Sequence, residues 1–253
     1  MATEQGINND LLELKVLKAP IWLMTFKFKT WTLQNLAAVQ EALDFLESQP
    51  GELGLITTGS HNRIYSAGGQ LTELIKDHQY RATFLMHLSK LFARLMKLSF
   101  PTVAAINGHC YGGGAIVAMC HDFRVMRSDT AEICLSEINV GIPLSLGQFH
   151  MFLSKMENAT VKKMAQFGSK YSAQQALAEH VVDLVVEQER LIQASLELLE
   201  PLVSKSKNRE VFRQIKEGIN HDSIRFSDTL FLVPLHMFDV LKKSHYTKNK
   251  QKL

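Results

Sequence analysis

The sequence lacks the long apolar runs and repeats that mark several classes of protein. Its 253 residues contain no run of about 18 apolar residues, so we expect no transmembrane helix. No glycine repeat or low-complexity block indicates a fibre. With 46% hydrophobic and 21% charged residues, the composition excludes a disordered chain. We therefore expect a soluble globular protein with one large domain or two small ones.

Cysteine is scarce, and neither cysteine nor histidine is spaced as in a metal site. The three cysteines, Cys110, Cys120 and Cys134, form no C-x-x-C pair, and their number is odd. This pattern favours free thiols in a reducing compartment over a disulfide or a metal site. The ten histidines show no H-x-x-x-H spacing, so the sequence predicts no bound metal.

The chain also lacks a broadly distributed basic charge. Its net charge is +3, but residues 242–252 contain five lysines and no acid, which leaves residues 1–241 with a net charge of −2. A nucleic-acid-binding protein would carry a basic stripe on its folded part, so the charge pattern argues against that class. The lysine-rich tail is either a solvated charge run or a segment that reaches anionic phosphates.

The two ends of the chain bear on its location in the cell. Residues 1–15 contain three acids and no arginine, so we expect neither a secretory signal nor a mitochondrial presequence. The last three residues, Gln251, Lys252 and Leu253, differ from the peroxisomal address S-K-L by Gln in place of Ser. By itself this ending is equally consistent with a frayed lysine-rich terminus.

The hydrophobic pattern predicts strands that alternate with helices. Short apolar or alternating segments predict strands at residues 12–16, 21–26, 53–58, 103–106, 123–126 and 133–135, of which the first two form a hairpin. Apolar residues at helical spacing predict helices at 32–48 and 84–98, with another from 115. From about residue 159 onward the pattern predicts helices alone. This order indicates an α/β fold with parallel strands and a helical C-terminal part.

Two glycine-containing loops follow predicted strands, at residues 65–70 and 107–114. Glycine lets backbone N–H groups turn toward a ligand, and a helix N-terminus adds unpaired N–H groups and a partial positive charge. Such loops fit an oxyanion site or a phosphate site, or they only allow tight strand-to-helix turns. Their spacing excludes the P-loop and the G-x-G-x-x-G dinucleotide motif with its following acid.

A third candidate for chemistry is Glu137, in the segment Leu135-Ser136-Glu137-Ile138. A glutamate between apolar residues is usually a solvated loop residue. A functional role requires a partly desolvated carboxylate, whose raised pKa would let it take and return a proton near neutral pH.

These segments together resemble the enoyl-CoA hydratase/isomerase superfamily, also called the crotonase family. The family pattern F-S-A-G-x-D-L is matched by YSAGGQL at residues 65–71, and A-A-x-N-G-x-x-x-G-G-G by AAINGHCYGGG at 104–114. C-D-x-R-I/V is similar to CHDFRV at 120–125, and P-E-I-x-x-G-I-P to SEINVGIP at 136–143. The resemblance extends over roughly residues 10–190.

The resemblance implies a crotonase (ClpP-like) spiral of ββα repeats with a helical C-terminal trimerisation region. Residues 1–190 would form the core with the acyl-CoA site, and residues 191–253 the helical region and the lysine-rich tail. Family members usually form trimers or hexamers through their C-terminal helices. An apolar stripe is consistent with this assembly, at Phe231, Leu232, Leu235, Phe238 and Leu241.

The resemblance also implies roles for eight residues. The amides of Gly69 and Gly113 would hold the thioester oxygen of an acyl-CoA. The substrate would further contact Ser66, Ala67, Gly68, Gly112 and Ile116. Family hydratases use two glutamates, and in this chain one of the two positions is Ile116 and the other is Glu137. Hydration needs two groups to hold and activate a water, whereas a 1,3-proton shift needs one base. Glu137 is therefore expected to act as a single catalytic base.

The activity implied is isomerisation of 3-enoyl-CoA to trans-2-enoyl-CoA in the β-oxidation of unsaturated fatty acids. The pattern is most similar to monofunctional Δ3,Δ2-enoyl-CoA isomerases of the plant-type peroxisomal group. Coenzyme A is part of the substrate, so no separate cofactor is expected. The resemblance favours a peroxisomal location, with a mitochondrial one as the alternative.

Three departures from the family pattern support a second hypothesis. Gln70 replaces the usual Asp, residues 30–32 (TWT) replace N-A-L, and residues 180–183 (HVVD) replace G-L-V-D. The chain would then be a crotonase-fold structural subunit or scaffold of a larger assembly, for example a mitochondrial one, with little or no turnover.

Overall fold

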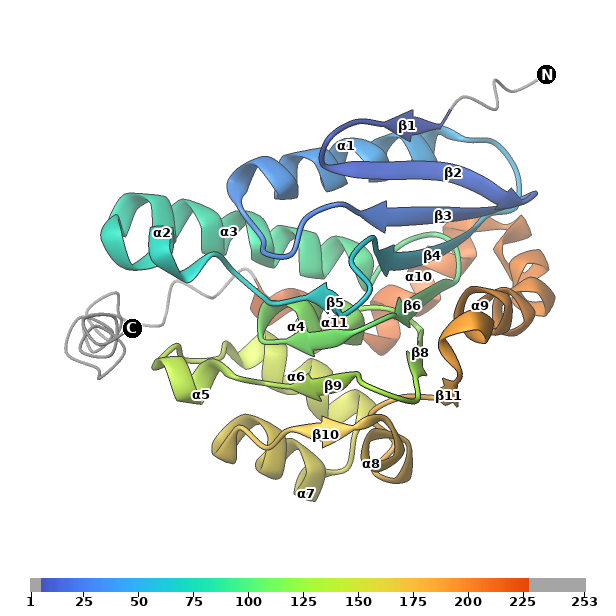
Figure 1. Cartoon of the computed structure of the whole chain (residues 1–253). Coiled ribbons are helices and arrows are strands. Elements are labelled where there is room, and N and C mark those ends of the chain that lie inside the picture. The colour runs from blue at the N-terminus through green and yellow to red at the C-terminus, as the bar shows by residue number, and fades with distance from the viewer. Residues whose placement is uncertain (1–5, 228–253) are drawn as a thin grey trace.

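The computed structural model describes residues 6–227, which form two β-sheets surrounded by helices (Figure 1). The larger sheet has the strand order β1-β2-β3-β4-β6-β8-β11. These strands are Ile7–Asn8, Leu12–Lys18, Ile21–Phe26, Gly54–Gly59, Thr102–Ile106, Phe123–Arg127 and Leu184–Val186. The smaller sheet has the order β10-β9-β7-β5. Its strands are Tyr171–Ser172, Glu132–Cys134, His109–Tyr111 and Ile64–Ser66.

The chain repeats one pattern three times: a strand of the larger sheet, a strand of the smaller sheet, then helix. The repeats are β4-β5 with α2 (Leu71–Lys76) and α3 (His78–Leu95), β6-β7 with α4 (Gly113–Met119), and β8-β9 with α5 (Glu137–Val140). Strands β3, β4, β6, β8 and β11 are paired in parallel, as are β5, β7 and β9. This is the spiral of ββα repeats. Because β5, β7 and β9 run parallel, their carboxyl ends, from which the chain continues into the helices, lie side by side.

The opening hairpin is confirmed, because β2 pairs antiparallel with β3. Helix α1 (Leu33–Ser48) follows, with Thr32 as its N-cap. The prediction of helices alone after residue 159 is wrong. Strands β10 and β11 lie in this region, beside helices α6 (Leu146–Lys155), α7 (Asn158–Val161) and α8 (Ala173–Ala178) and a π-helical turn at Lys162–Gln166. Strand β10 has two residues and β11 has three, too few for a recognisable hydrophobic alternation. Their backbone hydrogen bonds to β9 and β8 make them strands, and the sequence does not show this pairing.

The central strands β3, β4 and β6 of the larger sheet are buried on both faces. Ile21, Ile56 and Val103 face a cluster formed with Leu191, Leu199 and other apolar residues of the C-terminal helices. The neighbouring Leu55 and Ala104 face the main core, which α1, α3 and α4 cover. Burial on both faces explains why the central strands are short continuous apolar runs in the sequence.

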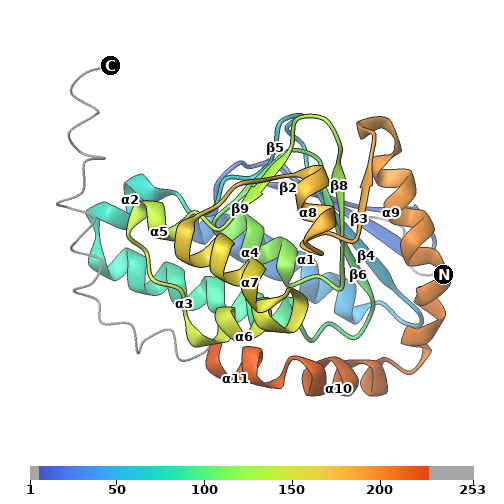
Figure 2. The same cartoon turned by 90° about the horizontal axis from the view of Figure 1, so that it is seen from below.

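The C-terminal helices wrap around the core. They are α9 (Leu191–Leu199), a 3₁₀ segment at Glu200–Lys207, α10 (Arg209–Ile219) and α11 (His221–Ser227), with a shorter 3₁₀ turn at Gln188–Arg190 before them. Figure 2 shows α10 and α11 end to end along one side of the molecule, with α11 beside α6. None of the helices within residues 6–227 has the length and apolarity that crossing a membrane requires. The apolar stripe at 231–241, the lysine-rich tail and the final tripeptide lie outside the described residues.

Helix α10 is attached to the core by an ion pair with little solvent access. Lys216 is 5% exposed, and its Nζ lies 2.9 Å from Oδ2 of Asp122, at the end of α4. The same carboxylate oxygen accepts a hydrogen bond from the backbone N–H of Thr102. Removing the lysine would deprive this mostly buried aspartate of its ion-pair partner and leave it the weaker attraction of Lys155.

We expect Lys216→Met to lower the free energy of unfolding by about 3 kcal/mol, because breaking a buried pair costs more than the pair contributes. Denaturant titration followed by circular dichroism measures the loss. Lys207→Met removes an exposed lysine of the preceding 3₁₀ segment and is expected to change stability by less than about 0.5 kcal/mol. Equal effects of the two substitutions would contradict the structural importance of the Lys216 pair.

Candidate active site

The first glycine loop is held by backbone hydrogen bonds to residues 29–31. The N–H of Ala67 donates to the carbonyl of Lys29 at 2.7 Å, and the N–H of Trp31 donates to the carbonyl of Gly68 at 2.8 Å. Gln70 continues the pairing by donating to the carbonyl of Trp31 at 3.0 Å. Gly68 has a φ of 83°, a conformation that glycine adopts without strain. The N–H of Gly69 takes no part in these hydrogen bonds and points away from residues 29–31.

Gln70 does not replace the hydrogen bonding that a shorter aspartate would provide. It is the N-cap residue of α2, and its side chain makes no capping hydrogen bond. Asp and Asn are favoured at this position because their oxygens reach the first amides of the helix. The loop nevertheless keeps its shape through the main-chain bonds to Lys29 and Trp31. The indole of Trp31 is fully buried and packs edge-on against Phe26 and Phe28.

The second glycine loop crosses the first in close contact. Gly112 has a φ of 53° and its N–H donates to the carbonyl of Cys134, after which α4 begins at Gly113. A Cβ on Gly114 would lie 2.5 Å from Cβ of Ser66, so only glycine fits at this crossing. A Cβ on Gly113 would lie 3.7 Å from the amide nitrogen of Gly69. The amides of Gly69 and Gly113 are therefore neighbours.

Both amides are available to a ligand. Neither the N–H of Gly69 nor that of Gly113 donates a hydrogen bond to any residue between 6 and 227. Gly113 is also the first residue of α4, where unpaired N–H groups and the helix dipole favour negative charge. Two adjacent free amides at a helix N-terminus can stabilise an oxyanion.

Within the described part of the chain, Glu137 is the one ionisable residue that lines the adjoining cavity. It is the first residue of α5, is 7% exposed, and its Oε2 has no hydrogen-bond partner among residues 6–227. Burial raises the pKa of its carboxyl from 4.5 to about 7. Its Oε1 would lie 3.2 Å from a Cβ on Gly112, so the absence of that Cβ gives the carboxylate its place.

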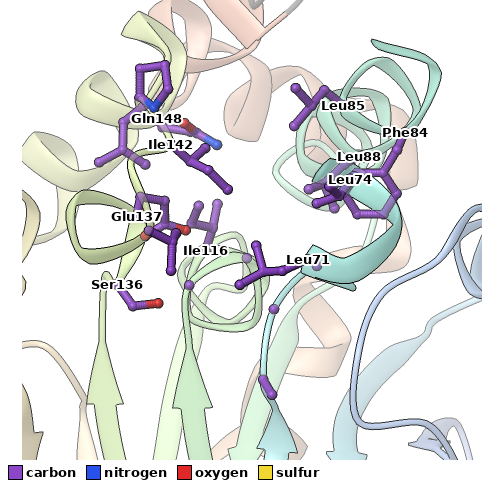
Figure 3. Close-up of a pocket in the computed structure, with 18 residues that line it drawn as sticks. Leu71, Leu74, Phe84, Leu85, Leu88, Ile116, Ser136, Glu137, Ile142 and Gln148 are labelled. Carbon is purple, nitrogen blue, oxygen red and sulfur yellow. The ribbon is translucent and has the colours of Figure 1, made fainter. Parts of the chain in front are cut away.

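The cavity lies between the two glycine loops, α2–α3 and the segment that follows α5 (Figure 3). Its water-accessible volume is about 80 Å³, several times what one water molecule needs. Leu71, Leu74, Phe84, Leu85 and Leu88, from α2 and α3, form one apolar wall, and Ile142 lies opposite them (Figure 3). Val140, Pro143 and Leu144, which neighbour Ile142 in the chain, also line the cavity. Ile116, 2% exposed, lies at the base near Glu137. An alkyl chain would be shielded from water between these walls.

The structure brings seven of the eight predicted site residues to the edge of this one cavity. They are Ala67, Gly68, Gly69, Gly112, Gly113, Ile116 and Glu137. Ser66 does not line it: the side chain is fully buried against Gly114, and its Oγ accepts a hydrogen bond from the N–H of Gly68. No group of three or more His, Cys, Asp or Glu side chains in residues 6–227 is arranged to hold a metal ion.

Sequence reasoning missed the apolar wall from α2–α3 and two polar lining residues, Ser136 and Gln148. The helical spacing of Phe84 and Leu88 indicates a buried face, but it cannot distinguish a face that lines a cavity from one that packs in the core. For Gln148 a local signal exists, since Ser145 and Gln148 have the S-x-x-Q spacing of a capping box.

Comparisons with known proteins identify relatives of this chain. Enoyl-CoA delta isomerase 3 of Arabidopsis thaliana is 26% identical over 205 residues, which cover 77% of this chain and 84% of that protein. A second Arabidopsis protein, the peroxisomal enoyl-CoA delta isomerase 2, is 26% identical over 200 residues, covering 73% and 81%. The structure of a probable enoyl-CoA hydratase, EchA3 of Mycobacterium tuberculosis, is 17% identical with a TM-score of 0.79, covering 93% and 100%, which shows the shared fold.

The family assignment rests on nearly the whole chain. Residues 21–250 match the family described as enoyl-CoA hydratase/isomerase. The chain therefore belongs to the enoyl-CoA hydratase/isomerase family, the crotonase family, whose fold it has.

Proposed function

We propose that the protein isomerises 3-enoyl-CoA to trans-2-enoyl-CoA by a proton shift on one base, Glu137. The observation that carries the proposal is a single buried carboxylate with an unpaired oxygen among the described residues, in an apolar cavity beside two free backbone amides. The two Arabidopsis relatives, both called enoyl-CoA delta isomerases, support the same activity.

The two amides would act on the thioester. When the thioester oxygen lies between the N–H groups of Gly69 and Gly113, both can donate to it. Negative charge grows on this oxygen as a proton leaves C2, so the two hydrogen bonds strengthen in the transition state. The partial positive charge at the start of α4 acts in the same direction.

Glu137 would carry the proton. Its carboxylate takes a proton from C2, and the electrons of that C–H bond enter a dienolate that extends from the thioester oxygen to C4. The protonated Glu137 then gives the same proton to C4, the double bond settles between C2 and C3, and the carboxylate is restored. A pKa of about 7 suits both steps, because the group is neither too weak a base nor too weak an acid at neutral pH.

Isomerisation is favoured over hydration because Ile116 occupies the place of the second hydratase glutamate. An isoleucine side chain cannot orient or activate a water. Incubation of the protein with trans-2-enoyl-CoA in water tests this directly. We expect 3-enoyl-CoA at equilibrium proportion and no 3-hydroxyacyl-CoA, whereas accumulation of the hydroxy product would identify a hydratase.

We expect Glu137→Gln to lower kcat by about 10²–10⁴-fold, the usual contribution of a general base. In the unsubstituted protein, kcat/KM should rise about tenfold per pH unit up to about pH 7 and then level off, because the base must be deprotonated in the free enzyme. Stopped-flow absorbance of the 2-enoyl thioester measures both. Wild-type turnover by a folded Glu137→Gln variant would refute the role of this residue.

The same substitution should stabilise the fold at alkaline pH. Burial raises the pKa of Glu137 in the folded protein to about 7, above the ordinary value of 4.5 that an unfolded chain restores. Folding therefore binds a proton between these pH values, and stability falls as the pH rises through them. Glu137→Gln removes this loss, with a gain of up to about 3 kcal/mol at pH 8 that shrinks toward zero near pH 4.5. Urea titrations at both pH values measure it. An equal effect of the substitution at both pH values would contradict the raised pKa of Glu137.

Gly113→Ala should separate activity from folding. The added methyl would lie 3.7 Å from the amide nitrogen of Gly69 and from Cα of Gly68, an ordinary contact, so the fold should tolerate it. It would fill the space where the thioester oxygen meets both amides, and we expect kcat/KM to fall about 10²–10³-fold with an unchanged melting temperature.

Gly218→Ala is the matched control for this substitution. A Cβ on Gly218 would meet no atom within 4 Å, and the residue lies in α10, far along the chain from the site. The same change of residue should therefore leave kcat/KM unaltered and stabilise the helix slightly. Undiminished activity of Gly113→Ala would remove its amide from the mechanism.

We also propose that the protein forms a homotrimer or hexamer and acts in peroxisomes. Helix α10 exposes Val211, Ile215 and Ile219 at 48%, 58% and 70%, which supports a subunit contact in the C-terminal region. The location is supported by the name of one relative, the peroxisomal isomerase 2 of Arabidopsis. Sedimentation and imaging of a protein tagged at its N-terminus test the two statements; a monomer or a mitochondrial signal would contradict them.

A further inference from the structure

Gln148 is a polar residue built into the wall of the acyl cavity. It is the third residue of α6 and forms a capping box with Ser145. Its N–H donates to Oγ of Ser145 at 3.2 Å, and its Oε1 accepts a hydrogen bond from the N–H of Ser145 at 2.7 Å. The side chain is 8% exposed. These two bonds hold it in one conformation.

The capping box decides which end of the carboxamide faces the cavity. Because Oε1 accepts from a backbone N–H, the other terminal atom must be the NH₂ group. Figure 3 shows this nitrogen directed between the two apolar walls, toward the side on which Leu85 lies. Nε2 donates no hydrogen bond to any residue between 6 and 227. Gln148 thus presents an unused donor to the cavity.

The side chains that Figure 3 labels near this donor supply no acceptor for it. Ile142 beside the carboxamide and Leu85 across the cavity are apolar, and the other polar lining side chains, Ser136 and Glu137, lie nearer the glycine loops (Figure 3). A plain alkyl chain that fills the cavity would displace water from the Nε2 group and leave it unpaired. Leaving such a donor unpaired in the complex should weaken binding by about tenfold or more.

We propose that Gln148 makes the site selective for acyl chains that carry a neutral hydrogen-bond acceptor, namely an oxo group, within the part of the chain that lies against α6. This inference deepens the proposed function, since it assumes that the acyl chain of an acyl-CoA enters the cavity. The carboxamide would donate to the ketone oxygen, and the rest of the chain would contact the leucine and isoleucine walls.

The charge and the donor inventory of the cavity favour a ketone over other polar groups. A carboxylate would be buried near Glu137, with no cation among the described lining residues to pair with it. A hydroxyl could accept from Nε2, but its own proton would find no acceptor among the apolar neighbours. A ketone only accepts, so one bond from Nε2 satisfies both partners.

Binding of saturated acyl-CoAs tests this selectivity without any turnover. Calorimetry would compare octanoyl-CoA with the 4-, 5-, 6- and 7-oxo-octanoyl-CoAs. The oxo-acyl-CoA whose ketone oxygen reaches Nε2 of Gln148 should bind about tenfold more tightly than octanoyl-CoA. In Gln148→Met, which keeps the length of the side chain but removes the donor, that oxo-acyl-CoA should bind more weakly than octanoyl-CoA. Oxo-acyl-CoAs that bind the unsubstituted protein no more tightly than octanoyl-CoA would overturn the inference.

Ser145→Ala is the matched control. It removes the Ser145 hydroxyl that accepts from the N–H of Gln148, but it keeps the backbone N–H of residue 145 that holds Oε1 of Gln148. The oxo preference should therefore persist even if the loss of the cap destabilises α6. Loss of the preference in Ser145→Ala as well as in Gln148→Met would assign the effect to helix stability and overturn the inference.

The outcomes separate this inference from the proposed function. Binding of octanoyl-CoA without oxo preference would refute the role of Gln148 alone and leave the isomerase proposal standing. Oxo preference in a protein that fails to isomerise 3-enoyl-CoA would refute the isomerase proposal alone. Binding of no acyl-CoA at all would refute both.

Discussion

The site depends on the close crossing of two backbone loops that side chains would hold apart. A Cβ on Gly68 would lie 3.1 Å from the amide nitrogen of Gly113, and one on Gly114 would lie 2.5 Å from Ser66. Because neither position has a Cβ, the amides of Gly69 and Gly113 meet, and both remain without partners in the described residues. The same crossing leaves room over Gly112 for the Glu137 carboxylate. The proposed oxyanion donors and the proposed base thus owe their relative positions to one constraint.

Helix α4 connects this crossing to a cluster of charged side chains at its other end, where the cations Arg124 and Lys216 pair with Asp183 and Asp122. Nζ of Lys155 and Nη1 of Arg124 both donate to the carbonyl of His121, just beyond the last turn. Burial lowers the pKa of Lys155 to about 8, so it stays mostly charged at neutral pH, and lowers the pKa of His121 to about 4, so the imidazole stays neutral. Cations at a helix C-terminus complement its dipole, whose positive end faces the proposed oxyanion. The buried charges around His121 therefore stabilise the helix in the orientation that the amide of Gly113 requires.

The sequence predicted the elements whose structure depends on their own residues, and it did not predict those whose structure depends on packing against other segments. Strands β4 and β6 could be predicted because continuous apolar runs of their length are buried on both faces. Strands β10 and β11 could not, since their pairing comes from β9 and β8 rather than from their own residues. His180 illustrates the same limit: it replaces a family glycine and keeps the left-handed φ of 55° that glycine would adopt freely. The inward carboxamide of Gln148 follows from a contact with Ser145 whose direction no residue pattern shows.

In the proposed mechanism, the apolar side chain of Ile116 helps to keep the pKa of the buried Glu137 carboxyl near neutral. Burial alone already raises the pKa of Glu137 to about 7, with no neighbouring acid contributing among the described residues. A second carboxylate at position 116 would share the same apolar cavity, and repulsion between the two charges would raise one of the pKa values further. With a single acid, no charged neighbour within residues 6–227 raises the pKa of Glu137 further, so at pH 7 about half of the molecules hold the proposed base in its ionised form. The apolar residue at position 116 and the single acid at 137 are therefore two parts of the same arrangement, and together they match a reaction that moves one proton along the substrate.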